Sequence, residues 1–258
     1  MAGNEMREQA RAAREAQEAA QKRRDRLTGI IGGAVVAVVV LGIIIASVVA
    51  KQGKDNVSAN ALPAGVDKSD YGVVYGSKTD GVPRVDLYED FQCPACAMFE
   101  PINGYRLVDL ADQGKITLVW HPASFLDDAK AAENQAAGNP NSSKRATAAW
   151  GCAIDAGKAA EYHKAVFANQ PKTEGQGYSD ITLLTLGSQI LDKGDLPKFS
   201  ECVNSGKYAD WAVASNQTFN KKGIASTPTL LINGKEQKPE VVFDQTGKKL
   251  LAAIAAAK

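Results

Sequence analysis

The segment V-P-R-V-D-L-Y-E-D-F-Q-C-P-A-C-A-M-F-E, at residues 82–100, decides the fold of this chain. Apolar and polar residues alternate from Val82 to Tyr88, which predicts a short β-strand. The tetrapeptide C-P-A-C follows at residues 93–96, and its Pro94 suits the first turn of a helix, where the missing N–H is not needed. A strand, a C-x-x-C motif and a helix in this order indicate a redox centre.

The position of Cys93 at the start of a helix favours its ionised form. Unpaired backbone N–H groups and the positive end of the helix dipole stabilise a thiolate there. Cys96 follows one turn later, close enough to close a disulfide with Cys93.

Zinc binding and a purely structural disulfide are the alternatives for this motif. A structural zinc site needs a second pair of ligands at comparable spacing. The remaining candidates are isolated in the sequence: Cys152, Cys202, His121 and His163. The redox interpretation is therefore preferred, and no metal or organic cofactor is expected.

The charge balance of the chain gives no indication of binding to nucleic acid or to a strongly acidic partner. The 258 residues carry a formal net charge of +1. Residues 1–26 hold seven basic and five acidic side chains, whereas the part from Lys51 onward holds 23 and 24. The basic excess therefore belongs to the N-terminal tail.

Residues 27–50 form an uncharged stretch of 24 residues dominated by Ile, Val, Ala and Gly. About 20 such residues cross a bilayer as a helix. A cleaved signal peptide, with Val48-Val49-Ala50 as its cleavage site, is the alternative, but the apolar part of a signal peptide spans only about 7–15 residues. We therefore expect an uncleaved signal anchor, which is a single N-terminal transmembrane helix.

The flanking charges predict the orientation of this anchor in the cell membrane. Four basic residues precede it, whereas only two follow it closely, at Lys51 and Lys54. The positive-inside rule then leaves residues 1–26 as a charged cytoplasmic tail and exports the rest. Residues 51–70 are polar and predict a linker, and the folded domain is expected at residues 71–258.

The folded part has the order of a small α/β domain. Strands are expected at 71–76, 82–88, 115–121 (ended by Pro122) and 229–233, and the region Val241–Phe243 is expected to form an edge strand or a turn. Helices are expected after the C-P-A-C motif to about Gly114, and at 145–158, 159–169, 179–191, 198–204, 208–222 and 248–258. The pattern predicts a helical domain inserted at about 124–222 into an α/β sheet domain.

A Thr227-Pro228 dipeptide opens the T-L-L-I-N strand, at a place where a cis peptide bond is tolerated for about 0.5–1 kcal/mol. Together with the upstream C-P-A-C, this order resembles the thioredoxin fold. The long helical insertion resembles the DsbA-like thiol:disulfide oxidoreductases, over roughly residues 70–258. The resemblance is carried by E-D-F-Q-C-P-A-C, S-S-K-R-A-T-A-A-W-G-C-A, E-Y-H-K-A-V-F-A-N-Q and G-I-A-S-T-P-T-L-L-I-N-G. The anchor and the extra cysteine pair are similar to those of actinobacterial members.

The resemblance implies a role for each residue of the motif. Cys93 would be the exposed nucleophile and Cys96 its buried partner. Pro228 would be a cis-proline facing the disulfide, and the backbone of Thr227 would pair with an extended substrate peptide. Pro94 and Ala95 form the dipeptide that tunes the thiols. Strongly oxidising members often have histidine at the position of Ala95, so the resemblance does not decide how strongly oxidising this protein is.

Several other residues near the motif have two interpretations. One of Asp86, Glu89 and Asp90 can take the proton of Cys96, as an acidic residue does in this fold, or each is a solvated loop charge. The two histidines are expected to be packing or surface residues. Three apolar residues are expected either to rim a substrate groove or to join the core: Phe91, Met98 and Phe99.

Cys152 and Cys202 lie in different predicted helices of the insertion. Four cysteines permit three pairings, but Cys93 and Cys96 pair with each other. In an exported domain the other two are expected to be oxidised to a structural disulfide. Closing a loop of about 50 residues contributes about 2–4 kcal/mol.

The predicted activity is the introduction of disulfide bonds into exported proteins. Reduced or unfolded exported proteins would be the substrates, and a membrane reoxidase of DsbB or VKOR-like type, implied by the resemblance, would restore the Cys93–Cys96 disulfide. An extracytoplasmic reductase or isomerase of the same fold is the alternative within the enzyme class. A membrane-tethered module that binds metal or substrate is the alternative outside it.

Overall fold

The computed structural model describes residues 59–76 and 81–257. The predicted tail at 1–26, the predicted anchor at 27–50 and the first part of the predicted linker lie outside the described residues. Among the helices that are described, none is both long and apolar enough to cross a membrane.

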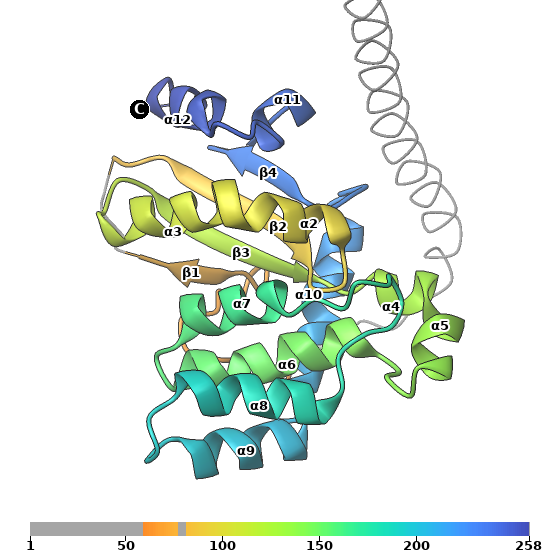
Figure 1. Ribbon diagram of the computed structural model, residues 1–258. Helices are drawn as coiled ribbons and strands as arrows, with labels where there is room; N and C mark the ends of the chain where they lie inside the picture. The colour runs from red at the N-terminus through yellow and green to blue at the C-terminus, as the bar shows by residue number, and fades with distance from the viewer. Residues whose placement is uncertain (1–58, 77–80, 258) are drawn as a thin grey trace, which may run out of the picture. The chain divides into compact units, whose positions relative to one another are not determined.

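A five-stranded mixed sheet organises the described part of the chain (Figure 1). The strands are β1 (Val73–Tyr75), β2 (Arg84–Asp90), β3 (Thr117–Ala123), β4 (Thr229–Ile232) and β5 (Lys235–Glu236). Their order across the sheet is β1-β3-β2-β4-β5. The β2–β3 pair is parallel and the other three pairs are antiparallel, so the sheet is mixed, and the predicted α/β class is confirmed.

Two strand predictions are wrong in detail. Strand β3 continues through Pro122 to Ala123 instead of ending before the proline. Strand β1 pairs with β3 only as far as Trp120. Pro122 therefore has no neighbouring strand on that side to which an N–H would have to donate. The region Val241–Phe243 forms no strand; it overlaps helix α11 (Pro239–Val242), because Pro239 occupies the first helical turn.

The helix after the C-P-A-C motif contains a π-helical turn that the sequence did not predict. Its three parts are α2 (Pro94–Phe99), η2 (Glu100–Gly104) and α3 (Tyr105–Asp112). They run along one face of the sheet (Figure 1). Gly114 follows with a φ of 66° and allows the chain to turn back toward β3.

Between β3 and β4 the chain is helical, as predicted. The helices are α4 (Leu126–Ala129), α5 (Ala131–Ala136), α6 (Ser142–Asp155), α7 (Ala159–Ala168), α8 (Asp180–Ile190), α9 (Leu196–Ser205) and α10 (Ala209–Lys221). Helix α6 contacts α7, α8, α9 and α10, and its buried face is nearly continuous because small residues alternate with Trp150 and Ile154. The chain ends in α12 (Lys248–Ala255).

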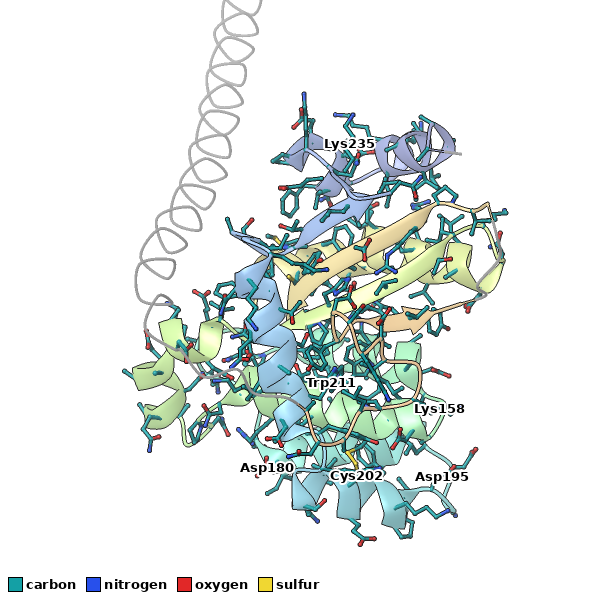
Figure 2. The ribbon with its side chains drawn as sticks, turned by 180° about the vertical axis from the view of Figure 1, so that it is seen from behind. Lys158, Asp180, Asp195, Cys202, Trp211 and Lys235 are labelled. Carbon is teal, nitrogen blue, oxygen red and sulfur yellow. A yellow bond between two sulfur atoms is a disulfide. The ribbon has the colours of Figure 1, made fainter. Side chains whose placement is uncertain are left out.

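A disulfide joins Cys152 of α6 to Cys202 of α9, across 50 residues of sequence. Figure 2 shows its sulfur atoms among the helices of the insertion, away from the sheet. The predicted pairing of these two cysteines is confirmed.

The core runs from the sheet into the helical region without a break. Trp120 of β3 and Trp150 of α6 meet edge to face, with ring centroids 5.7 Å apart. On the other face of the sheet, Tyr88 of β2 packs against Phe219 of α10. Central strand β2 is therefore covered on both faces, which determines the surroundings of its three carboxylates.

Candidate active site

Cys93 is the N-cap residue of α2, with φ −75° and ψ 117°, and Pro94 occupies the first helical turn. The backbone N–H of Cys93 donates to the Asp90 carbonyl at 2.8 Å, and its own carbonyl accepts from Ala97 at 3.2 Å. The side chain therefore sits at the helix N-terminus, where backbone N–H groups of Ala95 and Cys96 point toward its sulfur. The predicted position of the motif is confirmed.

Cys93 and Cys96 are free thiols, and both are buried. Cys96 is fully enclosed, as the resemblance implied. Cys93 is only 6 % exposed, so the expectation of an exposed nucleophile is wrong in degree. Its sulfur is covered by the Thr227 segment, which approaches within hydrogen-bond distance.

The two thiols have opposite acidities. The hydrogen bond from the Cys96 thiol is the largest cause that lowers the pKa of Cys93 to about 7, with help from the backbone N–H groups of Cys96 and Ala95. Burial first, and then the negative charges of Cys93 and Glu89, raise the pKa of Cys96 well above its ordinary value. Cys93 is thus the thiol that ionises near neutral pH, and Cys96 keeps its proton.

The Thr227–Pro228 peptide bond is cis and lies beside Cys93. The Sγ atom of Cys93 is 3.3 Å from the Thr227 carbonyl oxygen. This proximity follows from the sheet, because β4 pairs antiparallel with β2 and Tyr88 lies opposite Thr229. The start of β4 and the end of β2, which leads into the motif, therefore meet at the same edge.

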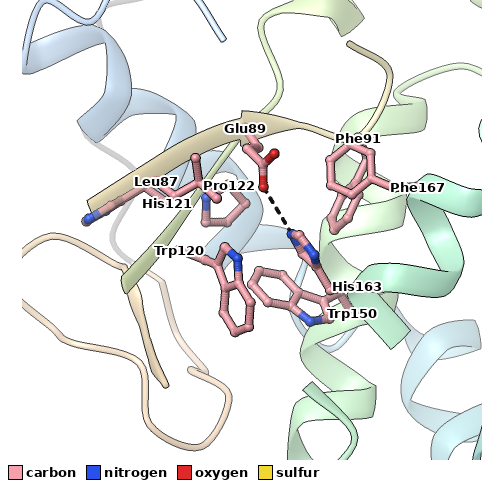
Figure 3. Close-up of a pocket in the computed structure, with 9 residues that line it drawn as sticks. All are labelled: Leu87, Glu89, Phe91, Trp120, His121, Pro122, Trp150, His163 and Phe167. Carbon is pink, nitrogen blue, oxygen red and sulfur yellow. Dashed lines mark ion pairs between the residues drawn. The ribbon is translucent and has the colours of Figure 1, made fainter. Parts of the chain in front are cut away.

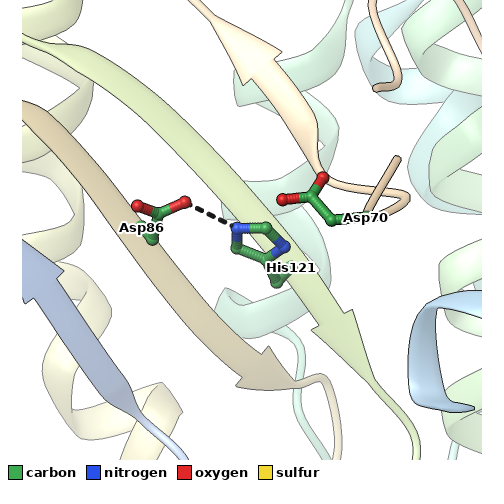
Figure 4. Close-up of side chains that lie close together, drawn as sticks. All are labelled: Asp70, Asp86 and His121. Carbon is green, nitrogen blue, oxygen red and sulfur yellow. Dashed lines mark hydrogen bonds and ion pairs between the residues drawn. The ribbon is translucent and has the colours of Figure 1, made fainter. Parts of the chain in front are cut away.

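The three carboxylates of β2 are all buried, so the interpretation as solvated loop charges is wrong. Asp86 lies toward the start of the strand, where Arg84 and His121 contact it at 2.7 and 2.8 Å. His121 lies between Asp86 and Asp70 (Figure 4). Although burial opposes it, hydrogen bonds from His121 and Arg84 lower the pKa of Asp86 to about 2. Asp86 thus belongs to a separate charge cluster.

Asp90 anchors the motif to the helical insertion. Its carboxylate accepts hydrogen bonds from the Ser143 hydroxyl at 2.5 Å and from the Gln92 and Leu126 backbone N–H groups at 2.9 and 3.1 Å. Burial and the neighbouring Asp127 raise the pKa of Asp90 to about 8. Its side chain is saturated with these donors, and only its backbone N–H faces Cys96.

Glu89 projects from the opposite face of β2, into a small cavity that Trp150 and His163 also line (Figure 3). Its enclosed carboxylate oxygens form no hydrogen bond of ordinary geometry among the described residues, but one of them lies 3.3 Å from Nε2 of His163 as an ion pair. Burial, followed by the charge of Glu100, raises the pKa of Glu89 to about 8, and the charge of Cys93 acts in the same direction. Of the three carboxylates, Glu89 is the one whose side-chain charge acts on Cys96.

The sequence did not identify the partners of Glu89. His163 of α7 places Nε2 3.3 Å from Glu89 and Nδ1 3.6 Å from Glu100. Both histidines are buried, yet each is paired with a carboxylate instead of being a simple packing residue. The string E-Y-H-K-A-V-F-A-N-Q contains His163, but nothing in it indicates which strand its imidazole faces.

The insertion also contacts the backbone that leads into the motif. The Gln170 amide donates to the Phe91 and Cys93 carbonyls at 2.8 and 3.0 Å, and the Tyr178 hydroxyl donates to Phe91 at 2.9 Å. Phe91 and Phe99 are buried in the core, whereas Met98 is 53 % exposed beside the motif. Of the three apolar residues, only Met98 is thus available to a groove.

Within the described part of the chain, two side-chain groups have residue types that bind metals, with ligand atoms within 4.8 Å of one another. The first is Asp70, Asp86 and His121, where Arg84 and Lys222 already neutralise the carboxylates. The second is Glu89, Glu100 and His163. There the two imidazole nitrogens face different carboxylates, an arrangement that suits a bridging imidazolium better than one shared cation.

Comparisons with known proteins agree with this geometry. The family described as thioredoxin matches residues 68–252. DsbA from Mycobacterium tuberculosis, in its reduced form, is 27% identical with a TM-score of 0.53, over 72% of this chain and 99% of that one. No curated protein sequence matches the chain.

Two further solved structures have the same fold. MdbA, a thiol-disulfide oxidoreductase from Actinomyces oris, is 23% identical with a TM-score of 0.61, over 80% of this chain and 97% of that one. BdbD from Bacillus subtilis is 20% identical with a TM-score of 0.59, over 76% and 97%. With its helical insertion, its C-P-A-C motif and its cis-proline, this chain belongs to the thioredoxin family, as a DsbA-like thiol-disulfide oxidoreductase.

Proposed function

We propose that this protein introduces disulfide bonds into exported proteins, with Cys93 as the sulfur that meets the substrate and Cys96 as its partner. The observation that carries the proposal is the asymmetry of the two thiols. Cys93 sits at a helix N-terminus, where it ionises near neutral pH, whereas Cys96 is enclosed and keeps its proton. A low-pKa thiol leaves readily from a mixed disulfide, which favours transfer of the disulfide to a substrate.

The reaction begins from the oxidised Cys93–Cys96 pair. A substrate thiolate attacks Cys93 Sγ, which forms a bond between substrate and Cys93 and breaks the Cys93–Cys96 bond. Cys96 leaves with the bonding electrons and takes a proton. A second substrate thiolate then attacks the substrate sulfur, and Cys93 leaves as the thiolate. The substrate is oxidised by two electrons, and the enzyme is reduced by two.

Glu89 is the residue that we propose to exchange the proton with Cys96. It is buried, its carboxylate forms an ion pair with His163 at 3.3 Å but no hydrogen bond of ordinary geometry among the described residues, and its negative charge raises the pKa of Cys96. Its pKa of about 8 allows both protonation states near neutral pH. Asp86 and Asp90 are unsuited to this role because other groups already bind their carboxylates.

The Cys152–Cys202 disulfide supports an oxidising compartment as the place of action. Structural disulfides persist outside the reducing cytosol, where exported proteins also acquire theirs. We propose that residues 27–50 anchor the protein in the cell membrane, with residues 1–26 in the cytoplasm and the redox domain outside. A membrane reoxidase of DsbB or VKOR-like type would return the pair to its disulfide form.

Oxidative refolding tests this function. Oxidised full-length protein is mixed with a reduced, unfolded test protein that needs disulfides for activity, and its reactivation is followed. We expect stoichiometric reactivation by the natural protein and none by Cys93→Ala. The double variant Cys152→Ala/Cys202→Ala is the matched control, since it removes cysteines distant from the motif and should keep the activity. Equal reactivation by Cys93→Ala would refute the proposal.

A reductase or isomerase is the second candidate, and one observation favours it. The pKa of Cys93 of about 7 is close to that of the attacking thiol of thioredoxin, at about 7, and far above that of DsbA, at about 3.5. Ala95 contributes no charge or side-chain donor that would lower it further. The reduction potential distinguishes the two directions.

A further inference from the structure

We propose that His163 is a positioning residue of this redox site: bridged between Glu89 and Glu100, it holds the charge that lets Glu89 exchange a proton with Cys96. This inference rests on the function proposed above and adds residues that neither the motif nor the comparisons identify. Three separate features of the structure lead to it: the contacts of the imidazole, the cavity and the π-helical turn.

The imidazole of His163 connects two buried carboxylates that would otherwise repel each other. Nε2 faces Glu89 at 3.3 Å and Nδ1 faces Glu100 at 3.6 Å. All three side chains are at most 5 % exposed. With both ring nitrogens directed at carboxylates, the protonated ring satisfies this geometry, because only an imidazolium donates from both nitrogens. Although burial opposes it, Glu100 and Glu89 raise the pKa of His163 to about 9.

The surroundings of this cluster leave few other sources of charge. Apolar rings enclose it from β3, α6 and α7: Trp120, Trp150 and Phe167 (Figure 3). His121 also lines the cavity, but Asp86 binds its imidazole at 2.8 Å. Among the described residues, the other titratable groups that face the cluster are Cys93, the N-cap of α2, Cys96 of α2 and Tyr105 of α3, whose pKa rises through burial and Glu100. In such surroundings a carboxylate at Glu89 depends on the His163 cation.

The cavity gives the Glu89 carboxylate room to change its partner. Its free space is about 10 Å³, which is close to the minimum that a single water molecule requires. Both oxygens of Glu89 are fully enclosed, and apart from the ion pair with His163 at 3.3 Å they form no hydrogen bond of ordinary geometry among the described residues. A buried carboxylate with an ion pair but no hydrogen bond of ordinary geometry is destabilising, so its retention here indicates a function other than stability.

The π-helical turn places Glu100 against His163. Segment η2 begins at Glu100, and its last residue, Gly104, leaves the space in which the Glu100 carboxylate lies. A Cβ atom at position 104 would be 2.1 Å from Oε1 of Glu100. π-helical turns are rare and occur frequently at functional sites.

Cys96 loses its proton when it attacks a mixed disulfide at Cys93. The S–H bond of Cys96 breaks and its proton passes to the Glu89 carboxylate. The Cys96 electron pair forms the bond to Cys93, and the former partner sulfur leaves as a thiolate. Cys93 and Cys96 end as a disulfide. Over this step and the earlier attack by Cys93 on the partner disulfide together, the pair is oxidised by two electrons and the partner is reduced by two. His163 stays protonated throughout, and it stabilises Glu89 in the ionised state that accepts the proton.

The test uses full-length reduced protein mixed rapidly with dithiobis(nitrobenzoate), an aromatic disulfide that releases a coloured thiolate. Attack by Cys93 releases the first thiolate, and attack by Cys96 on the resulting mixed disulfide releases the second. The rate of the second phase is measured as a function of pH. The pH midpoint of the second-phase rate reports the ionisation that activates Cys96. The pH midpoint of the first-phase rate reports the ionisation of Cys93 in the same sample.

Two substitutions should move this midpoint in opposite directions. His163→Gln removes the cation beside Glu89 and should raise the midpoint by about one pH unit or more. Glu100→Gln removes a neighbouring negative charge and should lower it. His163→Lys keeps a cation and should return the midpoint toward that of the natural protein. A merely structural role predicts slower or less stable variants with an unchanged midpoint.

The outcomes separate this inference from the proposed function. If the midpoints of His163→Gln and Glu100→Gln are unchanged, or shift in the same direction, the proposed role of His163 is wrong. The presence of the two thiolate-release phases would still support the proposed thiol chemistry. Absence of both phases in the natural protein contradicts the proposed function instead. If His163→Gln does not fold, Glu100→Gln decides alone: a lowered midpoint supports the inference, and any other result overturns it.

Discussion

The Sγ atom of Cys93 lies 3.3 Å from the carbonyl oxygen of Thr227, although 134 residues separate them in the sequence. A carbonyl oxygen accepts a hydrogen bond only from the thiol form, so this contact is lost when Cys93 ionises or forms a disulfide. The Thr227 carbonyl then becomes free to accept from the backbone of an extended peptide, in the manner of an added β-strand. The contact therefore couples the chemical state of Cys93 to the availability of a substrate-binding group.

The acidity of Cys93 should depend on Cys96. The ultraviolet absorbance of the thiolate, followed as a function of pH, should give a midpoint near pH 7 for the reduced protein. Cys96→Ala removes the hydrogen bond that contributes most to this value, so its midpoint should rise toward the ordinary cysteine value. A midpoint that stays near 7 in Cys96→Ala would assign the effect to the helix N-terminus alone.

The redox form of the motif should change how stability depends on pH. The folded pKa of Cys93 is depressed from 9.0 to about 7, so its contribution is present above the unfolded pKa and is lost as pH falls through 7. The reduced protein should thus gain on the order of 1–2 kcal/mol between about pH 6.5 and 8.5, relative to the oxidised protein, which has no such thiol. Urea unfolding of both forms over this range measures the difference, and parallel curves would contradict it.

The folded protein should require glycine at position 104, because a larger residue does not fit there. Although alanine in a helix is favoured over glycine by about 0.5–1 kcal/mol, Gly104→Ala should be destabilising by about 1–3 kcal/mol because its Cβ collides with Glu100. Gly194→Ala is the matched control, since nothing lies within 4 Å of its Cβ. Urea unfolding measures both variants. In a Glu100→Ala background the cost of Gly104→Ala should disappear, and persistence of the full cost would assign the glycine another role.

The Cys152–Cys202 disulfide should contribute to stability and leave the chemistry unchanged. It closes a loop across 50 residues, so Cys152→Ala/Cys202→Ala should lower the free energy of unfolding by about 2–4 kcal/mol. Below the melting temperature of the variant, the two thiol phases at Cys93 and Cys96 should keep their rates. A change in either rate would connect the disulfide to the redox site.

The parts of the fold that local signals specify could be predicted from the sequence. Pro94 after Cys93 marks a helix start, Ser179 caps α8 by accepting from the Thr182 N–H, and Asn233-Gly234 turns the chain after β4. These features depend on neighbours within four residues. The order of strands and helices then followed from periodicity, whereas the meeting of Cys93 and Pro228 was implied only by the resemblance to the thioredoxin fold.

The surroundings of the carboxylates could not be predicted in this way. Alternation in β2 suggested one wet face, but α10 packs against Tyr88 on that face. Asp86 and Asp90 are buried there through contacts with His121 and with Ser143 of α6. Glu89 meets His163 across 74 positions of sequence, through the packing of α7 against α2. No local pattern reports such a contact, because it depends on how the insertion folds back over the motif.

The reduction potential of the Cys93–Cys96 pair tests the central claim most directly. The full-length protein is equilibrated in glutathione buffers of known ratio, and the fraction of the pair that is oxidised is measured. The proposed donor of disulfides should have a potential less negative than about −200 mV, toward the value of DsbA at about −120 mV. A potential near −270 mV, where thioredoxin lies, would contradict this claim and identify the protein as a reductase.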